Sequence, residues 1–555
     1  MSDLIKDLRY FWSKKVFAAS LLLTMVISYA TLLLHPTVGI DDTSFKLYYI
    51  DGVSPAMGRW CLYMINKCFP LDYNPYFVET LGLLCFCLSV SLWCVAFYRV
   101  FGTRLPVIVY TAFACVMISS PILSEVVIWY VQDGIYLGYG MTALAVLAGE
   151  RMFAQRTWNR KAFGYTVLSA ALLTVALGFY EAFMIVYLMG MLMVFLSLRL
   201  VREERYTGKP LRWLGNLFLL CALAMVFRSV CISGITAVFH LEDQTLVLKN
   251  RGLSDIAALF GGWFDGSRGA DAFGLLLKEF LVKYTIHGIV YVPVLILVLG
   301  EGVLVLLGGI YSVRGEDGWV FLAVVGMLVL PWVMPLLEGT ATYYRSSEYV
   351  PLLTAFAVLL IGYALYRVKR SVRVRGVALF CAFFLLYQQG YEMNKWLLID
   401  ANKYEDDKRT LDALALELMR SYDVEKPICV IGDRATPESL LERVYTPEWS
   451  KKYRLVQVLV CGIDERIFAK YDTPQGYAVA ESPQLSFINW ADKAYYGFDR
   501  ELIKFWKMHG FTFTEDGNLA HYKEARKLMQ GAPVWPQEGS IVELEEYIIV
   551  NFGSE

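Results

Sequence analysis

The sequence of 555 residues lacks the short motifs that mark several common chemistries. It has no Cys-x-x-Cys pair and no cysteine–histidine cluster with zinc spacing, so a structural metal centre is not expected. It also has no P-loop and no Gly-x-Gly-x-x-Gly fingerprint, which leaves nucleotide chemistry without an obvious site. Charged residues make up only 19% and hydrophobic residues 57%, with a mean hydropathy of +0.46. This balance excludes an ordinary soluble domain and indicates a multi-pass membrane protein.

Eleven apolar segments are candidates to cross the ~30 Å hydrocarbon core of a bilayer. The first follows four basic residues and has no small-residue cleavage site, so we interpret it as a retained anchor and not as a signal peptide. The predicted spans cover residues 16–34, 76–98, 105–123, 135–149, 162–179, 182–198, 213–237, 288–311, 319–337, 349–366 and 377–391.

The distribution of lysine and arginine fixes the predicted orientation. With the N-terminus in the cytoplasm, the inner segments carry 21 basic residues and the longer outer loops carry 9. This bias is the positive-inside pattern of membrane proteins. An odd number of spans then places everything after residue 391 outside.

The tail, residues 392–555, has 20 basic and 28 acidic residues, a net charge of −8. It contains a helical stretch, DKRTLDALALELMRSY, and strand-like segments such as PICVIGD and the terminal SIVELEEYIIVNF. The predicted fold class is therefore an α-helical polytopic membrane protein, with a membrane domain over residues 1–391 and an extracytoplasmic α/β domain over residues 392–555. Tryptophans and tyrosines of the tail, such as Trp506 and Trp535, could stack on sugars or form its core.

The first outer loop, residues 35–75, concentrates polar residues directly after a span. His35 is followed by Gly39-Ile40-Asp41-Asp42 and then by Gly58-Arg59. Residues 57–69 have helical apolar spacing and suit a helix along the membrane surface. From spacing alone, the aspartates could equally form a polar turn and helix cap.

Other outer segments add hydrogen-bonding groups. Trp129, Gln132 and Asp133 lie in the loop 124–134, where aromatic residues are also common as interfacial anchors. Tyr180 and Glu181 occupy a very short turn between two spans, and a carboxylate there is costly unless it lines a wet cavity. Arg345 is the only basic residue of its outer loop.

These features resemble the C-type (GT-C) superfamily of membrane glycosyltransferases, and within it the type-II glucosyl transferases that modify O-antigen and other surface polysaccharides. The matching stretches are the acidic first loop with Gly58-Arg59, LGFYEAF at 177–183, YYRS at 343–346 and APVWPQEGSI at 532–541. Relatives tend to have Tyr-Gln where this chain has Tyr180-Glu181.

The resemblance implies a sugar, usually glucose, carried on polyprenyl phosphate and transferred with inversion on the outer face of a bacterial cytoplasmic membrane. The acceptor would be a surface polysaccharide. A separate glycosyltransferase would make the donor and a flippase would deliver it; nucleic acid has no part.

Transfer from a lipid phosphate requires a base for the acceptor hydroxyl and cations for the departing phosphate. We predict Asp41 as the base, with Asp42 orienting it, binding the acceptor or holding a divalent cation. Arg59 and Arg345 are the candidates for the phosphate, because a guanidinium matches phosphate oxygens. His35, Tyr180, Glu181, Trp129, Gln132 and Asp133 are predicted to contact substrate.

Two charges lie inside predicted spans, Arg228 and Glu301, and could form a structural ion pair. The alternatives to a glycosyltransferase are a transporter or flippase for a lipid-linked glycan, or a polysaccharide polymerase or ligase. No matched pair of Gly/Pro-broken helices supports a transporter. A polymerase or ligase needs a long outer loop late in the chain, whereas the most suggestive loop here is the first.

Overall fold

The computed structural model describes most of the membrane part and the end of the tail. The described residues are 2–37, 53–68, 75–127, 134–155, 159–201, 210–241, 300, 302, 304–306, 318–333, 347–368, 372–432, 434, 500–514 and 516–553.

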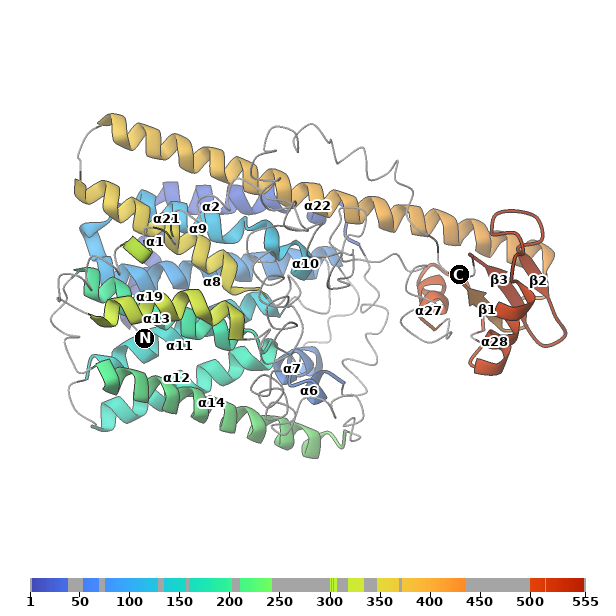
Figure 1. Ribbon diagram of the computed structural model, residues 1–555, viewed down its shortest axis with the longest axis horizontal. Helices are drawn as coiled ribbons and strands as arrows, with labels where there is room; N and C mark the ends of the chain where they lie inside the picture. The colour runs from blue at the N-terminus through green and yellow to red at the C-terminus, as the bar shows by residue number, and fades with distance from the viewer. Residues whose placement is uncertain are drawn as a thin grey trace, which may run out of the picture.

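A bundle of roughly parallel and antiparallel helices forms one half of the molecule (Figure 1). Helices occupy ten of the predicted span positions, while the predicted span 288–311 lies mostly outside the described residues. The helices are apolar on several sides, as expected where both neighbouring helices and lipid surround them. Their bounds are α2 Lys15–Ser28, α3 Ala30–Leu34, α8 Pro75–Phe101, α9 Val107–Ile118, α11 Ile135–Phe153, α12 Arg160–Phe179, α13 Phe183–Val201, α14 Pro210–Val238, α19 Gly318–Val329, α21 Tyr349–Val368 and α22 Val372–Ser421.

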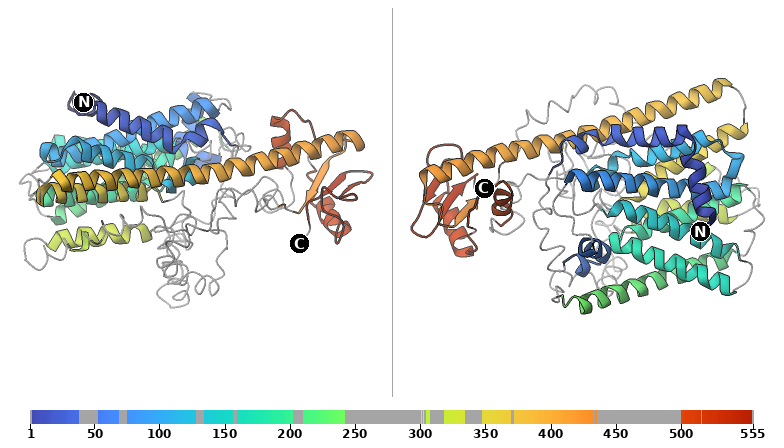
Figure 2. Two further views of the ribbon diagram at one scale, coloured as in Figure 1. Left: turned by 90° about the horizontal axis from the view of Figure 1, so that it is seen from above. Right: turned by 180° about the vertical axis from the view of Figure 1, so that it is seen from behind.

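Among the described residues, five helices are long and apolar enough to cross a membrane. A sixth candidate is α1 (Ser2–Trp12) taken together with α2, although the two are bent by 76°. Asp7 of α1 pairs with Arg99 at the end of α8, with 3.1 Å between Oδ2 and Nε. The bend and this ion pair hold α1 across the end of the bundle (Figure 2).

The opposite end of the bundle, which we call the loop end, carries the first predicted outer loop. There α6 (Val53–Ala56) and α7 (Trp60–Cys68) pack near the ends of α12 and α14 (Figure 1). The short elements η2 (Pro121–Leu123) and α10 (Ser124–Val127) follow α9 at the same end. The described part of the first predicted outer loop therefore lies at the same end of the bundle as η2 and α10.

Helix α22 is 50 residues long and runs through the predicted domain boundary at residue 391 without a break. At 1.5 Å per residue it is about 75 Å long, far more than a bilayer requires. Beside the first span it is held by Asn394, whose Oδ1 accepts from the Thr31 hydroxyl at 3.0 Å. Beyond the bundle it carries the end of the tail (Figure 2).

The described tail contains a three-stranded sheet in the order β1-β3-β2, with β1 and β3 parallel and β2 antiparallel to β3. The terminal stretch predicted as one strand is two strands joined by a turn. The second, β3, is the central strand and is buried at every position, as is β1, so its sequence does not alternate. The bounds are β1 Ile428–Ile431, β2 Ile541–Glu543, β3 Ile548–Asn551, α27 Arg500–Met508 and α28 Leu519–Leu528.

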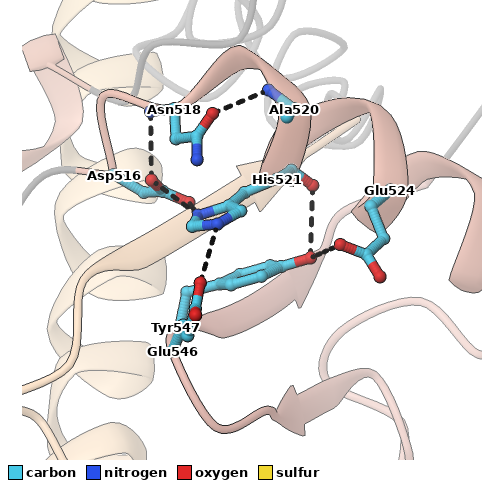
Figure 3. Close-up of polar contacts among 7 residues, drawn as sticks. All are labelled: Asp516, Asn518, Ala520, His521, Glu524, Glu546 and Tyr547. Atoms are coloured by element: carbon cyan, nitrogen blue, oxygen red, sulfur yellow. Dashed lines mark hydrogen bonds and ion pairs between the residues drawn. The ribbon is translucent and has the colours of Figure 1, made fainter.

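A polar cluster joins α28 to the β2–β3 turn (Figure 3). His521 Nδ1 lies 3.1 Å from Asp516 Oδ2, and its Nε2 lies 3.2 Å from Glu546 Oε2. The imidazole stacks on the Tyr547 ring, with centroids 4.3 Å apart, and the Tyr547 hydroxyl donates to Glu524 Oε2 at 3.3 Å. This cluster fixes the helix against the sheet.

Candidate active site at the loop end of the bundle

Helix α7 is the part of the first predicted outer loop that the structure places directly. The Cys61 thiol donates to the carbonyl of Val175 at 3.3 Å. A Cβ on Gly178 would lie 2.6 Å from both Cys61 Sγ and Trp60 Cε2, so only glycine lets α7 approach α12 this closely. The helix predicted to lie along the membrane surface therefore also packs on the end of a span.

Arg59, just before α7, reaches the turn between α12 and α13. Its Nε lies 3.8 Å from Glu181 Oε2, and its guanidinium carbon lies 4.6 Å from the centre of the Tyr180 ring. The Arg59 and Glu181 side chains are 16% and 27% exposed, so water screens this pair only partly. Tyr180 is buried at 4% exposure. Arg59, Tyr180 and Glu181, all predicted to contact substrate, thus form one group.

A second arginine approaches the same place from α14. The Arg228 guanidinium packs against Gly58, where an added Cβ would collide with it. Gly58 also has a φ of +86°, a conformation that side-chain-bearing residues rarely adopt. Arg228 interacts electrostatically with Glu181 as well. Arg59 and Arg228 therefore both come close to the turn at Tyr180-Glu181, and Gly58 provides the space that Arg228 occupies.

We call Arg59, Tyr180, Glu181 and Arg228 the arginine cluster. It holds two cationic groups and one carboxylate, and so carries a net positive charge near the loop end. Guanidinium groups in partly desolvated positions bind phosphate oxygens strongly. The carboxylate orients one guanidinium, and the Tyr180 ring supports it through a cation–π contact. Chemically, the cluster can hold an anion at the membrane surface.

The base of the first loop is anchored separately. The Thr37 hydroxyl donates to Asp400 Oδ2 at 2.7 Å, and both residues are buried. Asp400 lies nine residues beyond the last predicted span, on the extension of α22. Burial raises the pKa of Asp400 to about 7, while the Thr37 hydrogen bond and nearby Lys403 oppose that shift. Thr37 precedes Asp41 by four residues along the chain.

Of the other predicted site residues, the structure describes only His35, which does not join the arginine cluster. His35 is exposed just after α3, and its backbone N–H donates to the Thr31 carbonyl at 2.8 Å. The remaining six lie outside the described residues: Asp41, Asp42, Trp129, Gln132, Asp133 and Arg345. Glu301, considered as a partner for Arg228, also lies outside them.

Sequence reasoning missed several charged residues at the loop end. Arg228 was noted only as an intramembrane charge, with a structural ion pair to Glu301 slightly preferred, and was not linked to Arg59 or Glu181. Glu79 near the start of α8 and Glu348 before α21 are 4% and 1% exposed. The Tyr139 hydroxyl donates to the Glu348 carbonyl at 2.7 Å. Their burial depends on helix packing, which no local pattern encodes.

A bundle of membrane-capable helices with a cluster of two arginines and one carboxylate at one end indicates a polytopic membrane protein with a polar site at that end. The chain belongs to the glucosyl transferase GtrII family, whose pattern it matches over residues 30–387. The match includes all four residues of the arginine cluster and ends within α22, before the sheet. It supports glycosyltransferase activity and glucosyl transfer in the modification of surface polysaccharides. No curated protein and no solved structure matches the chain significantly.

Proposed function

We propose that the protein transfers a glucosyl group from a polyprenyl-phosphate donor to a surface polysaccharide on the outer face of a bacterial cytoplasmic membrane. The family match supports glucosyl transfer. The observation that supports the choice of donor is the arginine cluster, in which Arg59 and Arg228 converge on Glu181 at the loop end of the bundle, the end expected to face the outer membrane surface. A lipid phosphate presents its charge at that depth, whereas a soluble nucleotide sugar has no need of a site there.

The proposed reaction is a single displacement. The acceptor hydroxyl oxygen attacks the anomeric carbon while Asp41 removes its proton, and the bond from that carbon to the phosphate oxygen breaks. Attack from the face opposite the leaving group inverts the anomeric configuration. Arg59 and Arg228 stabilise the charge that develops on the departing phosphate, which is where preorganised cations accelerate a reaction most.

Glu181 and Tyr180 have a supporting role in this proposal. Glu181 lies near both guanidinium groups, which keeps them from repelling each other across the cluster. The Tyr180 ring supports the Arg59 guanidinium through a cation–π contact. Asp42 orients Asp41, binds the acceptor or holds a divalent cation, should the reaction need one.

The test uses the purified full chain in lipid nanodiscs with a panel of polyprenyl-phosphate sugars, and follows release of polyprenyl phosphate. We expect Asp41→Asn to lose about 10²–10⁴-fold in turnover while still binding donor, as for loss of a general base. Arg59→Ala should weaken donor binding by roughly 10–100-fold, the value of a hydrogen bond to a charged group. Arg420→Ala, at an exposed arginine far along α22, is the matched control.

Two outcomes would overturn the proposal. If the wild type releases no polyprenyl phosphate from any donor and moves a lipid-linked glycan across the bilayer instead, the protein is a transporter. If turnover is normal in Asp41→Asn and Asp42→Asn, the first loop does not supply the base.

A further inference from the structure

The APVWPQEGSI stretch, residues 532–541, lies outside the family match and forms a tethered loop at the end of the sheet. The backbone N–H of Trp535 donates to the Asn551 carbonyl at 2.8 Å. The Asn551 side-chain amide donates to the Pro533 carbonyl at 2.9 Å. Asn551 is itself 1% exposed at the end of the central strand. The loop is therefore fixed to the most buried strand of the sheet.

This tether sets the orientation of the Trp535 ring. Its indole Nε1 donates to Glu417 Oε2 of α22 at 3.0 Å, and the ring meets Phe552 in an edge-to-face arrangement with centroids 5.9 Å apart. The ring remains partly exposed, in contrast to Trp506, which is fully buried and donates to the Leu411 carbonyl. Because the N–H of Trp535 is already used, a ligand would meet the exposed part of the aromatic ring.

Exposed apolar and acidic residues flank Trp535 in this loop, and Glu417 contacts its indole N–H. Pro533 and Pro536 are exposed, and Val534 is 38% exposed. Glu417 and Glu538 add carboxylates that accept hydrogen bonds from hydroxyl groups. An aromatic face beside hydrogen-bond acceptors suits a sugar, whose C–H face is apolar and whose edge is hydroxylated. The acidic surroundings, within a tail of net charge −8, oppose anionic lipid head groups.

The position of the Trp535–Glu417 contact along α22 indicates which kind of sugar ligand can reach it. Glu417 lies 17 residues beyond Asp400 on one continuous helix, which is about 25 Å at 1.5 Å per residue. The sheet lies at the far end of this helix, on the same side of the bundle as α7 (Figure 1). A donor sugar attached to a lipid phosphate cannot reach that far. A polymer of several sugar units can contact both the Trp535 loop and the loop end of the bundle.

We propose that Trp535, with its flanking residues and Glu417, forms a subsite for the polysaccharide acceptor. It holds the polymer through one or more sugar units distant from the unit that is glucosylated. That the bound polysaccharide is the acceptor of the reaction rests on the proposed function. The binding of polysaccharide itself does not.

The test measures equilibrium binding of surface polysaccharide, purified from the cells that make this protein, to the full chain in nanodiscs without donor. We expect Trp535→Ala to bind at least about tenfold more weakly, the order of loss when an aromatic anchor is truncated. Trp535→Phe keeps an aromatic face and should retain most of the affinity. Leu519→Ala, at an exposed apolar residue of α28, is the matched control, and melting temperatures verify that each variant is folded.

A second measurement separates this proposal from the proposed function. Release of polyprenyl phosphate with a single-repeat acceptor should be unchanged in Trp535→Ala. The subsite is refuted if wild type does not bind the polysaccharide, if Trp535→Ala binds it as well as wild type, or if the loss appears equally in Leu519→Ala. It is also refuted if Trp535→Ala weakens only self-association or binding to anionic vesicles. None of these results depends on whether transfer itself is detected.

Discussion

Asp400 makes the stability of the protein depend on pH, and its substitution by asparagine should remove this dependence. Its folded pKa is about 7, against an ordinary value of 3.8, because the carboxyl group is buried. The difference of about three pH units corresponds to about 4 kcal/mol at 1.36 kcal/mol per unit. The unfolded chain loses this proton first, near pH 4, while the folded chain keeps it until about pH 7.

Stability from this group is therefore fully present below about pH 4 and declines as the pH rises towards 7. Above that value both states are ionised and the loss is complete. Asp400→Asn cannot ionise, yet its amide can still hydrogen-bond to Thr37. We expect the variant to gain up to about 4 kcal/mol over wild type between pH 4.5 and 8, with the gain appearing progressively.

The measurement is denaturant unfolding of the full chain in nanodiscs across this pH range, recorded as the difference between variant and wild type. Asp423→Asn, at an exposed aspartate on the same side of the bundle, is the control for a change of charge alone. Thr37→Val should raise the folded pKa of Asp400 further, because the lost hydrogen bond favoured the charged carboxylate. The difference between Asp400→Asn and its parent should then keep growing to a higher pH. A difference profile that is flat, or that falls as the pH rises, would refute the assignment of Asp400 as a buried, mostly protonated group at pH 5–6.

Three further predictions concern close packing and the tail cluster. Gly58→Ala should weaken donor binding because its Cβ displaces Arg228, whereas Gly102→Ala, also at positive φ but facing open space, should bind donor normally; donor titration decides this. Gly178→Ala should cost about 1–3 kcal/mol by overpacking against α7, and an unchanged melting temperature would contradict that contact. Asp516→Asn, at a side chain 4% exposed, should lower the melting temperature more than Glu546→Gln, at one 76% exposed, and the reverse order would contradict the structure.

The positions of the helices were predictable because hydrophobic runs of membrane length leave little choice of structure. Ten of the predicted spans coincide with helices, and the short turn at Tyr180-Glu181 is where the sequence placed it. The tail was harder. Helix α22 continues through residue 391 with Gly390 inside it, so the helix does not end where the sequence changes from apolar to charged residues.

The arginine cluster could be predicted only in part. Arg59 and the turn at Tyr180-Glu181 were separate candidates, because each is a polar residue where a span meets water. Their contact requires α7 to fold back onto α12, which depends on a close approach at Gly178. Arg228 joins them from α14 through the space left by Gly58. Such distant contacts have no periodic signal in a single sequence.

The boundary of the family match divides the molecule in a way that bears on specificity. All members of the arginine cluster lie within residues 30–387, together with Asp41 and Asp42. The tethered Trp535 loop lies beyond it, on a sheet that α22 holds at a distance from the bundle. Chemistry common to a family must act on what its substrates share, which for the proposed reaction is the sugar phosphate. Acceptor polymers differ, so recognition of the polymer is the part that can move to a separate segment without disturbing the transfer site. On this reasoning, we propose that the matched region determines donor use and that the tail determines acceptor choice.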